Sequence, residues 1–433
     1  MTPLPQQTLP RKRAPERRRT QTSTVAVLGM GYVGLPTALQ LHSAGFNVLG
    51  VDTSAGRVGA IEMGSVDLLP AEHGRLRAAL SDERWTVTTG LELLETADVI
   101  LICVPTPLNH EDRTPDLRPL KAACASVVKQ ARAGQTIVLT STTSIGSTRR
   151  LLVEPIEAEG LRVGEDIHIA YAPERIWPGV VEYQQHTVPR ILGGLTPECA
   201  SVAEDVLGRI AAHVHVVSSL EAAEACKLHE NTFRAVNLAW VNEMADAYRA
   251  LGLDAIEIME AAATKPYGFM AHYPGPGVGG HCIGVDPEYL LADFGEAGVQ
   301  APITSSAMAG IARRPHQVAN RALTLLEQNQ VPACRARVLV VGVAFKPQVQ
   351  DTRDSTALEI IADLRSAGCS VAYHDPLVAS VRVDGVTLLS VDPDPSRYDL
   401  VILHTIHQQT DLDRLGQARL TLDCTYRHGG ELI

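Results

Sequence analysis

The hydrophobic residues of the first half of the chain form short continuous runs that alternate with helical patterns. The first run leads through a glycine-rich turn into an apolar helical stretch that ends near Ala44. Continuous apolar runs of five to seven residues between helices are typical of strands buried on both faces of a parallel sheet. The pattern therefore predicts an α/β unit whose sheet lies in the middle. The strand-like runs are residues 24–28, 47–51, 98–104, 136–140 and 167–171.

A much longer helical pattern follows this unit. Ser218, Ser219 and Glu221 form a capping box, and the pattern continues to Leu251, where Gly252 ends it. Such a helix would hold about 33 residues and measure roughly 50 Å, which is long enough to bridge two domains. Two further helical patterns follow: one begins at residue 254, and the other covers residues 303–327.

The last hundred residues return to alternating strands and helices. Residues 337–341, 370–373 and 399–403 are strand-like, with a helix from residue 355 to about 365. The fold class is therefore expected to be α/β, with two Rossmann-like doubly wound domains joined by a helical domain with a long central helix. The expected divisions are a disordered basic tail at residues 1–22, a first Rossmann domain at 23–216, a central helical domain at 217–330 and a last Rossmann-like domain at 331–433.

The amino-acid composition indicates a globular protein and its expected cellular location. The chain has 433 residues, of which 45% are hydrophobic, enough for the cores of two or three domains. No apolar run reaches the roughly 18 residues that a membrane helix needs, and no signal-peptide pattern is found, so we expect a cytoplasmic protein. The eight cysteines lack paired or CxxC spacing, which argues against a disulfide framework and against a metal site.

The formal net charge of −11 is unevenly distributed. Basic clusters occupy residues 11–13 and 17–19, so the remainder of the chain is strongly acidic. The composition of the first 22 residues predicts disorder. Binding of nucleic acid or of an anionic surface is one interpretation of this tail, but a solubilising extension is favoured, and the acidic remainder argues against a nucleic-acid-binding core.

The turn after the first strand has a dinucleotide-binding pattern. Gly29, Gly31 and Gly34 form a GxGxxG sequence between a strand and a helix, and the second strand ends in Asp52. Glycines at these positions let backbone N–H groups approach a pyrophosphate at the N-terminus of the helix, while the carboxylate can bind the ribose hydroxyls. Because a carboxylate repels a 2′-phosphate, NAD is the expected cofactor rather than NADP.

A glycine-rich stretch at residues 275–287, GPGVGGHCIGVDP, presents one cysteine. Four glycines, Gly279 among them, leave few side chains beside Cys282, and Asp286 follows four residues later. The alternative is a structural cysteine buried in a turn. The density of glycine and the nearby acid favour a reactive thiol.

Polar residues at the ends of other strands could join this thiol. Pro105 and Thr106 follow one predicted strand, Thr142 follows the next, and Glu174 and Arg175 follow the third. Each could be ordinary loop polarity when taken alone. The carboxyl ends of parallel strands meet at one edge of a sheet, however, and this shared position favours a functional role.

The long helix and the last domain offer cationic groups. Lys227 and Asn231 are four residues apart and therefore share one helical face, with Arg234 just beyond them. A solvated polar stripe is the alternative, but the other sides of this helix are apolar, which favours a cleft-facing set. The last domain lacks the glycine pattern, and Lys346 and Arg353 instead offer charges suited to a diphosphate.

Six motifs in the same order give the chain its resemblance to the UDP-glucose/GDP-mannose dehydrogenase family, from about residue 24 to 425. They are VAVLGMGYVGLP, ICVPTP, APERIWPG, CKLHENTFRAVN, GPGVGGHCIGVDP and GVAFKPQVQDTRDS. The resemblance implies an NAD-dependent oxidoreductase of nucleotide sugars that serves polysaccharide biosynthesis. The apolar sides of the long helix exceed what one bridge between two domains must bury, so we also expect a homodimer or a higher homo-oligomer.

The resemblance implies a role for each matching residue. Cys282 would be the nucleophile, Lys227 and Asn231 would stabilise oxyanions, Asp286 and Thr142 would position or activate water, and Glu174 would be an acid/base residue. The implied NAD contacts are Gly29, Gly31, Tyr32, Val33, Gly34, Asp52, Arg57, Pro105, Thr106 and Thr142. The implied substrate contacts are Arg175, Ile176, Lys227, Asn231, Arg234, Gly279, Phe345, Lys346 and Arg353, and no metal is implied.

The chain departs from the family pattern in places. Gly284 follows the nucleophile where proline is common, Thr140 and Ile145 replace a frequent Glu and Pro around the Ser-Thr turn, and Gly268 lies near where some members have an intersubunit arginine. The sequences AAATKPYGF and PGPGVGGHC resemble the branch that acts on UDP-N-acetylhexosamines, especially UDP-N-acetylglucosamine.

The sequence thus predicts a UDP-N-acetylhexosamine 6-dehydrogenase. The C6 alcohol would be oxidised by NAD to an aldehyde, held on Cys282 as a thiohemiacetal, oxidised again to a thioester and released as the uronate. The open alternatives are UDP-N-acetylmannosamine or UDP-glucose as substrate, a dehydrogenase that performs a single oxidation, and a nucleotide-binding protein without catalysis.

Overall fold

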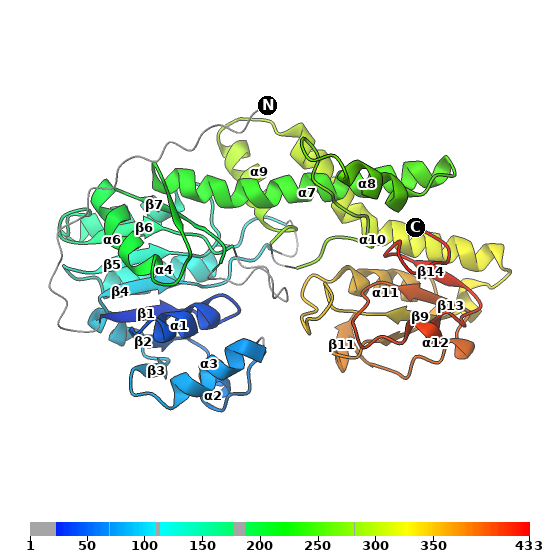
Figure 1. Cartoon of the computed structure of the whole chain (residues 1–433), viewed down its shortest axis with the longest axis horizontal. Helices are drawn as coiled ribbons and strands as arrows, with labels where there is room; N and C mark the ends of the chain where they lie inside the picture. Colours follow the sequence, from blue (N-terminus) through cyan, green and yellow to red (C-terminus); the bar gives the residue numbers. More distant parts are fainter. Residues whose placement is uncertain (1–22, 69, 110–112, 176–186, 281) are drawn as a thin grey trace.

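The protein is described by a computed structural model that covers residues 23–68, 70–109, 113–175, 187–280 and 282–433. Three groups of elements follow one another along the chain: a large sheet with its helices, a set dominated by two long helices, and a smaller sheet (Figure 1). The basic tail and Ile176 lie outside the described residues, so the predictions made for them do too.

Eight of the described strands form the first sheet: β1 (Thr24–Leu28), β2 (Asn47–Val51), β3 (Trp85–Thr88), β4 (Val99–Ile102), β5 (Thr136–Leu139), β6 (His168–Tyr171), β7 (Arg190–Gly194) and β8 (Val214–Val217). Their order is β3-β2-β1-β4-β5-β6-β7-β8. The strands from β3 to β6 are parallel, whereas β7 is antiparallel to β6 and parallel to β8. The strand order reverses at β1 and β4, where an open parallel sheet offers a crevice to ligands.

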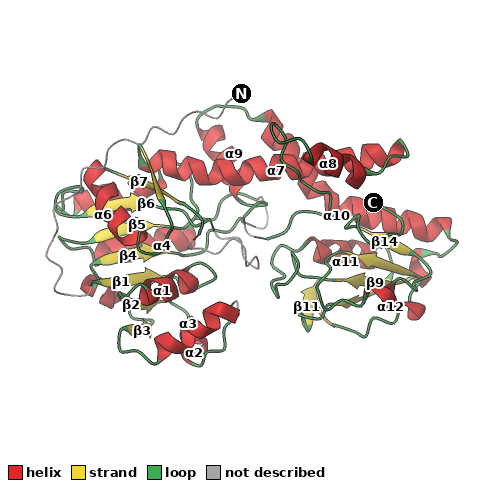
Figure 2. Ribbon diagram, viewed as in Figure 1, coloured by secondary structure: helices red, strands yellow, loops and turns green. Residues whose placement is uncertain are grey.

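Helices cover both faces of this sheet (Figure 2). Val25 and Val27 of β1 enter one hydrophobic core, and Ala26 and Leu28 enter the core on the other face. Burial on both faces explains why these strands read as continuous apolar runs. The helices are α1 (Gly34–Ser43), α2 (Ala55–Glu62), α3 (Pro70–Leu80), α4 (Arg118–Lys129), α5 (Glu154–Ala158) and α6 (Pro197–Leu207), with a 3-10 turn at Leu91–Thr96 and a π-helical turn at Arg149–Val153.

The predicted long helix is α7 (Leu220–Ala250), which has 31 residues. Ser219 caps it by accepting a hydrogen bond from the Ala222 N–H. In Figure 1, α7 starts above the first sheet and extends towards α8 (Ala255–Ala263), while α9 (Asp286–Glu296) and α10 (Pro302–Gln328) pack against it. None of the helices in the described part of the chain is long and apolar enough to cross a membrane.

The second sheet consists of β9 (Arg337–Val341), β10 (Ser370–His374), β13 (Leu400–Leu403) and β14 (Thr421–Asp423). These strands are parallel, in the order β10-β9-β13-β14. The α/β fold class with two Rossmann-like sheets and a helical middle is confirmed. The remaining elements are the antiparallel pair β11 (Ser380–Val383) and β12 (Val386–Leu389), the helices α11 (Thr356–Ser366) and α12 (Leu412–Leu415), and 3-10 turns at Ala333–Arg335 and Pro395–Arg397.

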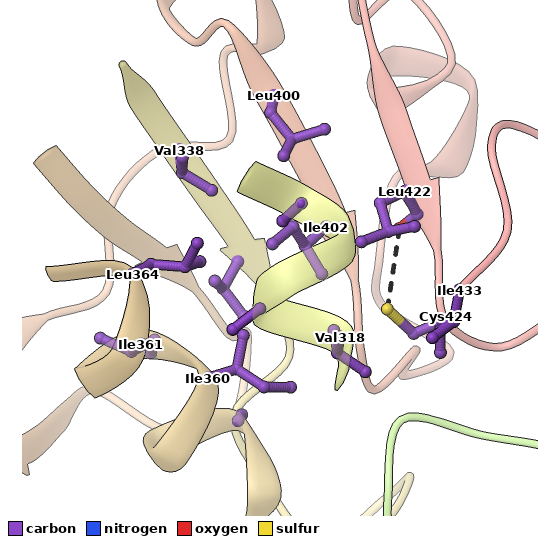
Figure 3. Packing of buried hydrophobic residues seen from close by; sticks show 14 of the residues in the cluster. Val318, Val338, Ile360, Ile361, Leu364, Leu400, Ile402, Leu422, Cys424 and Ile433 are labelled. Atoms are coloured by element: carbon purple, nitrogen blue, oxygen red, sulfur yellow. Dashed lines mark hydrogen bonds between the residues drawn. The ribbon is translucent and has the colours of Figure 1, made fainter. Parts of the chain in front are cut away.

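The core of the second sheet includes the long helices. Val318 of α10 lies in one cluster with Val338 of β9, Ile360 of α11 and Ile402 of β13 (Figure 3). Val241 of α7 belongs to the same cluster. The core therefore draws on residues before 331, where the sequence pattern predicted the last domain to begin.

Candidate active site

The turn between β1 and α1 is built on the predicted glycines. Gly29 has a φ of +93° and donates its N–H to Val51 O at 2.8 Å. A Cβ on Gly34 would lie 1.8 Å from Gly29 O, so another residue could not start a helix this close to the strand. At Gly31, by contrast, no atom lies within 4 Å of where a Cβ would be. This open space beside the first N–H groups of α1 fits the pyrophosphate of a dinucleotide.

Asp52 is at the carboxyl end of β2 and is held against the same turn. Its Oδ2 accepts the Met30 N–H at 2.9 Å, and its Oδ1 accepts the Ser54 N–H at 2.9 Å. Arg57 donates from Nε to Met30 O at 2.7 Å. These bonds fix the orientation of the carboxylate, whose other lone pairs remain suited to ribose hydroxyls. The residues of this turn therefore fit NAD.

Three neighbouring strands present the other predicted groups at one edge of the sheet. Because β4, β5 and β6 are adjacent and parallel, the turns that follow them lie side by side. Tyr289 of α9 donates its hydroxyl to Thr106 O at 3.1 Å, which fastens α9 to this edge. The predicted residues in these turns are Pro105 and Thr106 after β4, Thr142 after β5, and Glu174 and Arg175 after β6.

Four of the predicted catalytic residues meet beside this edge. Asn231 donates from Nδ2 to Asp286 Oδ2 at 2.5 Å, and Lys227 Nζ lies 3.9 Å from the same oxygen. Lys227 also donates to Glu174 O at 3.1 Å. Lys227 and Asn231 are one helical turn apart on α7, which is why both reach the single carboxylate at the start of α9.

Burial and charge set the ionisation of this cluster. Burial raises the pKa of Asp286 to about 6, against the opposing effects of Lys227 and of the Asn231 hydrogen bond. Burial alone would lower the pKa of Lys227, but the negative charges of Asp286 and of the nearby Glu174 and Glu230 raise it above its usual value. Lys227 is therefore cationic at neutral pH, where Asp286 is mainly a carboxylate.

Cys282 is exposed to solvent as a residue. Many protein atoms nevertheless lie around its thiol and change the pKa of that group. Burial raises the pKa of the thiol; Lys227 lowers it, Asp286 raises it, and Arg234 and Lys346 lower it. Burial also lowers the pKa of Lys346 to about 8, helped by repulsion from Arg234. The thiol thus shares one region with the Lys227, Asn231 and Asp286 cluster of α7 and α9 and with a lysine of the last domain.

The glycines before Cys282 serve a purpose that the sequence did not reveal. A Cβ on Gly277 would lie 2.6 Å from Thr356 Cγ2, and one on Gly279 would lie 2.6 Å from Asp354 O. Gly280 has a φ of +83°, and a Cβ there would lie 2.9 Å from the Phe345 ring. The sequence indicated only that these glycines leave few side chains beside Cys282. In the structure they allow the loop to press against the domain of the second sheet.

The second sheet also approaches the cofactor-binding turn. The guanidinium of Arg353 stacks on the Tyr32 ring, 4.6 Å from its centroid, and pairs with Asp351. Tyr32 precedes Val33, the residue that caps α1. The predicted NAD contact at Tyr32 and the predicted substrate contact at Arg353 are therefore in contact with each other, and the two walls of the site meet there.

Arg175 and Glu174 point to different partners. Arg175 pairs with Glu230 of α7, with Nε 3.1 Å from Oε2, and donates from Nη1 to Pro189 O at 2.8 Å. A substrate contact by Arg175 would therefore compete with Glu230. The Glu174 carboxylate pairs with Arg190, whose side chain is almost completely buried.

Arg314 of α10 is a structural residue of the site that sequence reasoning missed. It is 1% exposed, and it donates from Nε to Gly275 O at 3.1 Å and from Nη2 to the Tyr426 hydroxyl at 2.9 Å. Its Nη1 pairs with Asp246 of α7 at 2.8 Å. One guanidinium thus joins the glycine loop (residues 275–287), both long helices and the last domain. Nothing in the local sequence distinguishes Arg314 from its exposed neighbour Arg313.

Two of the four departures from the family pattern, Gly284 and Ile145, have hydrogen-bond partners in the structure. Gly284 O accepts a hydrogen bond from Arg113 Nη2 at 2.8 Å, and the Ile145 N–H donates to Asp293 Oδ2 at 2.7 Å. Gly268 has a φ of +68°, and Thr140 is buried. Two carboxylates missed by sequence reasoning, Glu224 and Asp293, hold the turn that contains Ile145. Glu224 could have been found, because it lies one helical turn before Lys227.

Comparison with known proteins follows the order of the domains. Residues 23–211 match the NAD binding domain of the UDP-glucose/GDP-mannose dehydrogenase family, residues 221–310 match its central domain, and residues 339–426 match its UDP binding domain.

Individual relatives resemble the chain over almost its full length. It is 33% identical over 414 residues to an NDP-N-acetyl-D-galactosaminuronic acid dehydrogenase from Ralstonia solanacearum, covering 92% of this chain and 95% of the relative. It is 32% identical over 409 residues to a UDP-N-acetyl-D-glucosamine 6-dehydrogenase from Pseudomonas aeruginosa, with coverage of 92% and 95%. Among solved structures, a UDP-D-ManNAc dehydrogenase from Pyrococcus horikoshii matches with a TM-score of 0.85 at 31% identity, covering 93% of this chain and 95% of that one.

The ionisation of Cys282 gives a first prediction. Because burial raises the pKa of its thiol, alkylation of Cys282 by iodoacetamide should accelerate with pH and reach no plateau below about pH 9. Lys227→Met should slow alkylation at pH 8 by several-fold, since it removes a charge that lowers this pKa. Peptide mass spectrometry measures the rate, with the exposed Cys334 as internal reference and Lys265→Met as control. A plateau below pH 8 would contradict the burial argument.

Proposed function

We propose that this chain, which belongs to the UDP-glucose/GDP-mannose dehydrogenase family, oxidises the C6 alcohol of a UDP-N-acetylhexosamine, in particular UDP-N-acetylglucosamine, twice to give the uronate. The family predicted from the six sequence motifs is confirmed. As a member of it, the chain is an NAD-dependent UDP-sugar 6-dehydrogenase. The choice of sugar and the roles of individual residues are proposals.

The observation that carries the proposal is the meeting of Lys227, Asn231 and Asp286 beside Cys282. A single oxidation of an alcohol needs no nucleophile, whereas a second oxidation requires the aldehyde to be converted into a species that can again lose hydride. The thiol supplies that conversion. The cation and the amide donor suit the negative charge that each stage forms on oxygen.

NAD, when bound, accepts a hydride from C6 in each of the two oxidations. After the first, the Cys282 sulfur adds to the aldehyde carbon, and the thiol proton ends on the former carbonyl oxygen, giving a thiohemiacetal. The second loss of hydride, with loss of that proton, leaves a thioester. Water then adds to the thioester carbon, and the C–S bond breaks to release the carboxylate and restore the thiol.

The chain's own residues act at defined atoms of this sequence. Lys227 Nζ and Asn231 Nδ2 can stabilise the oxyanion of each tetrahedral species, an effect of about 3 to 4 kcal/mol per well-placed donor. Asp286, with a pKa of about 6, is a carboxylate at neutral pH and can accept a proton from the attacking water. Thr142 and Glu174, at neighbouring strand ends, are proposed to position that water and to exchange the proton of the C6 hydroxyl.

The choice of an N-acetylated sugar is supported by the names of the relatives. The two curated relatives are named for N-acetylgalactosaminuronic acid and N-acetylglucosamine, and the solved structure for N-acetylmannosamine. A site that hydrogen-bonds an acetamido group would penalise a sugar without it, because its polar groups would be left unpaired. The motifs AAATKPYGF and PGPGVGGHC favour the glucosamine branch.

The substrate proposal predicts a ranking and a stoichiometry. UDP-N-acetylglucosamine should be oxidised with a higher kcat/KM than UDP-N-acetylmannosamine, UDP-N-acetylgalactosamine or UDP-glucose. Two NADH should form for each sugar consumed. A panel assay that follows absorbance at 340 nm and quantifies the uronate tests both. One NADH per sugar would point to a single oxidation. A preference for UDP-glucose would contradict the proposal that the site recognises the acetamido group.

The proposed nucleophile and base predict a trapped intermediate. Cys282→Ser should keep nucleotide-sugar binding but lose uronate formation by roughly 10³-fold or more, since a hydroxyl is a far weaker nucleophile than a thiol. Asp286→Asn should slow hydrolysis and accumulate a sugar-nucleotide adduct on Cys282. In the unmodified enzyme, hydrolysis should weaken below pH about 6, where Asp286 is protonated. Early quenching and intact mass spectrometry measure the adduct, which must be absent from Cys282→Ser.

A homodimer or higher oligomer is proposed from the long helix. Phe233 and Trp240 of α7 are 44% and 52% exposed, and Ile303 at the start of α10 is 74% exposed. Large apolar side chains gathered on two packed helices suit a symmetric partner. Light scattering at micromolar concentration should give at least twice the mass of one chain, and Trp240→Glu should reduce it. A monomeric mass for the unmodified protein would disprove this assembly.

A further inference from the structure

The turn that follows β5 carries Thr142 and is held at both ends. On one side, Ser141 Oγ donates to Val104 O at 2.8 Å, which anchors the turn to the end of β4. On the other side, the Ile145 N–H donates to Asp293 Oδ2 at 2.7 Å. Thr142 lies between these two anchors, so its position depends on both.

The Asp293 anchor occupies a specific backbone position. The Ser147 N–H donates to Ser144 O at 3.1 Å, and Gly146 has a φ of +81°. A hydrogen bond across four residues with a positive φ at the third is the pattern of a type II turn, in which Ile145 is the second residue. Proline is common at that position because its ring fixes φ near the value the turn requires. Ile145 lacks the ring but has an N–H, and Asp293 binds it.

Asp293 also connects this turn to the proposed base. It lies seven residues after Asp286 on α9, two helical turns away and therefore on the same face. Asp286 at the start of the helix reaches the cluster of α7, and Asp293 reaches the turn of Thr142. Glu224 of α7 completes the arrangement by accepting the Gly146 and Thr148 N–H groups. The side chain of Ile145 packs in a cluster with Leu228 and Val285, the neighbours of Lys227 and Asp286.

We infer that Asp293 is a positioning residue of the reaction: through the Ile145 N–H it fixes the Thr142 turn relative to Asp286, supplying by a hydrogen bond the constraint that proline gives in such a turn. This inference rests on the proposed function, because Asp293 would act through Thr142 and Asp286, whose roles belong to that proposal. It accounts for why the chain tolerates Ile145. The orientation of Thr142 is thereby tied to the helix that presents the base.

The test is a double-mutant cycle of Asp293 against the two donors that it binds in the turn, the Ile145 N–H and the Ser144 side chain. Asp293→Ala should lower kcat about 10- to 100-fold while changing the KM for the UDP-sugar less than about threefold, since small displacements of positioned groups have effects of this size on turnover. Asp293→Asn keeps an acceptor oxygen and should remain within about threefold of the unmodified enzyme. Asp293 also accepts a hydrogen bond from the Ser144 side chain, so the reference background is I145P with Ser144→Ala. Neither donor remains there, and adding Asp293→Ala should lower kcat less than about threefold.

Controls separate this inference from its alternatives. Glu296→Ala, which removes an exposed carboxylate from the end of the same helix, should leave kcat unchanged. If Asp293 served only the stability of α9, its substitution would cost the same in both backgrounds, and that result would overturn the inference. So would a kcat for Asp293→Ala equal to that of the unmodified enzyme. The NADH count and Cys282→Ser judge the proposed function independently, in the unmodified Asp293 background.

Discussion

The site depends on a carboxylate that is almost completely removed from water. Asp286 is 1% exposed, and a buried charge of this kind costs several kcal/mol unless a partner compensates it. Lys227 and Asn231 provide the compensation, so α7 must pass within hydrogen-bonding distance of the first turn of α9. The requirement that stabilises the buried acid also assembles the proposed oxyanion donors beside the thiol. Stability and chemistry therefore constrain the same pair of helices.

The second constraint is the fit between the glycine loop and the last domain. Gly277, Gly279 and Gly280 have no room for a Cβ because residues after β9 press against them. Arg314 fastens the beginning of the loop from the other side. The thiol thus sits on a segment clamped between two domains rather than on a free turn. Contact between Tyr32 and Arg353 also joins the glycine turn after β1 to the domain of the second sheet.

Local patterns predicted the strands whose sequences are continuous apolar runs and missed those whose sequences are not. The strands β1, β2 and β9 match their apolar runs residue for residue, because both faces of each are covered. β3, β7 and β8 were missed: β3 and β8 are partly exposed, whereas β7 is fully buried but reads RILGG, in which an arginine and two glycines interrupt the apolar run. The predicted catalytic residues could be named because they sit in dense motifs. Of their anchors, Glu224 could have been found from its place one helical turn before Lys227. Asp293 could not, because it binds the Ile145 N–H 148 positions away in sequence, and no local pattern marks such a pairing.

In the proposed mechanism, the ionisation of Cys282 makes hydrolysis of the thioester the step that depends most on the surroundings of the thiol. Formation of a thiohemiacetal moves a proton from sulfur to oxygen without net release, so the raised pKa of the thiol does not oppose that addition thermodynamically. Cleavage of the thioester is different, because a sulfur with a higher pKa is a poorer leaving group. Strong activation of the attacking water can offset this disadvantage. A carboxylate with a pKa of about 6, held by α7 and placed at the start of α9, has the basicity and the fixed position for that step.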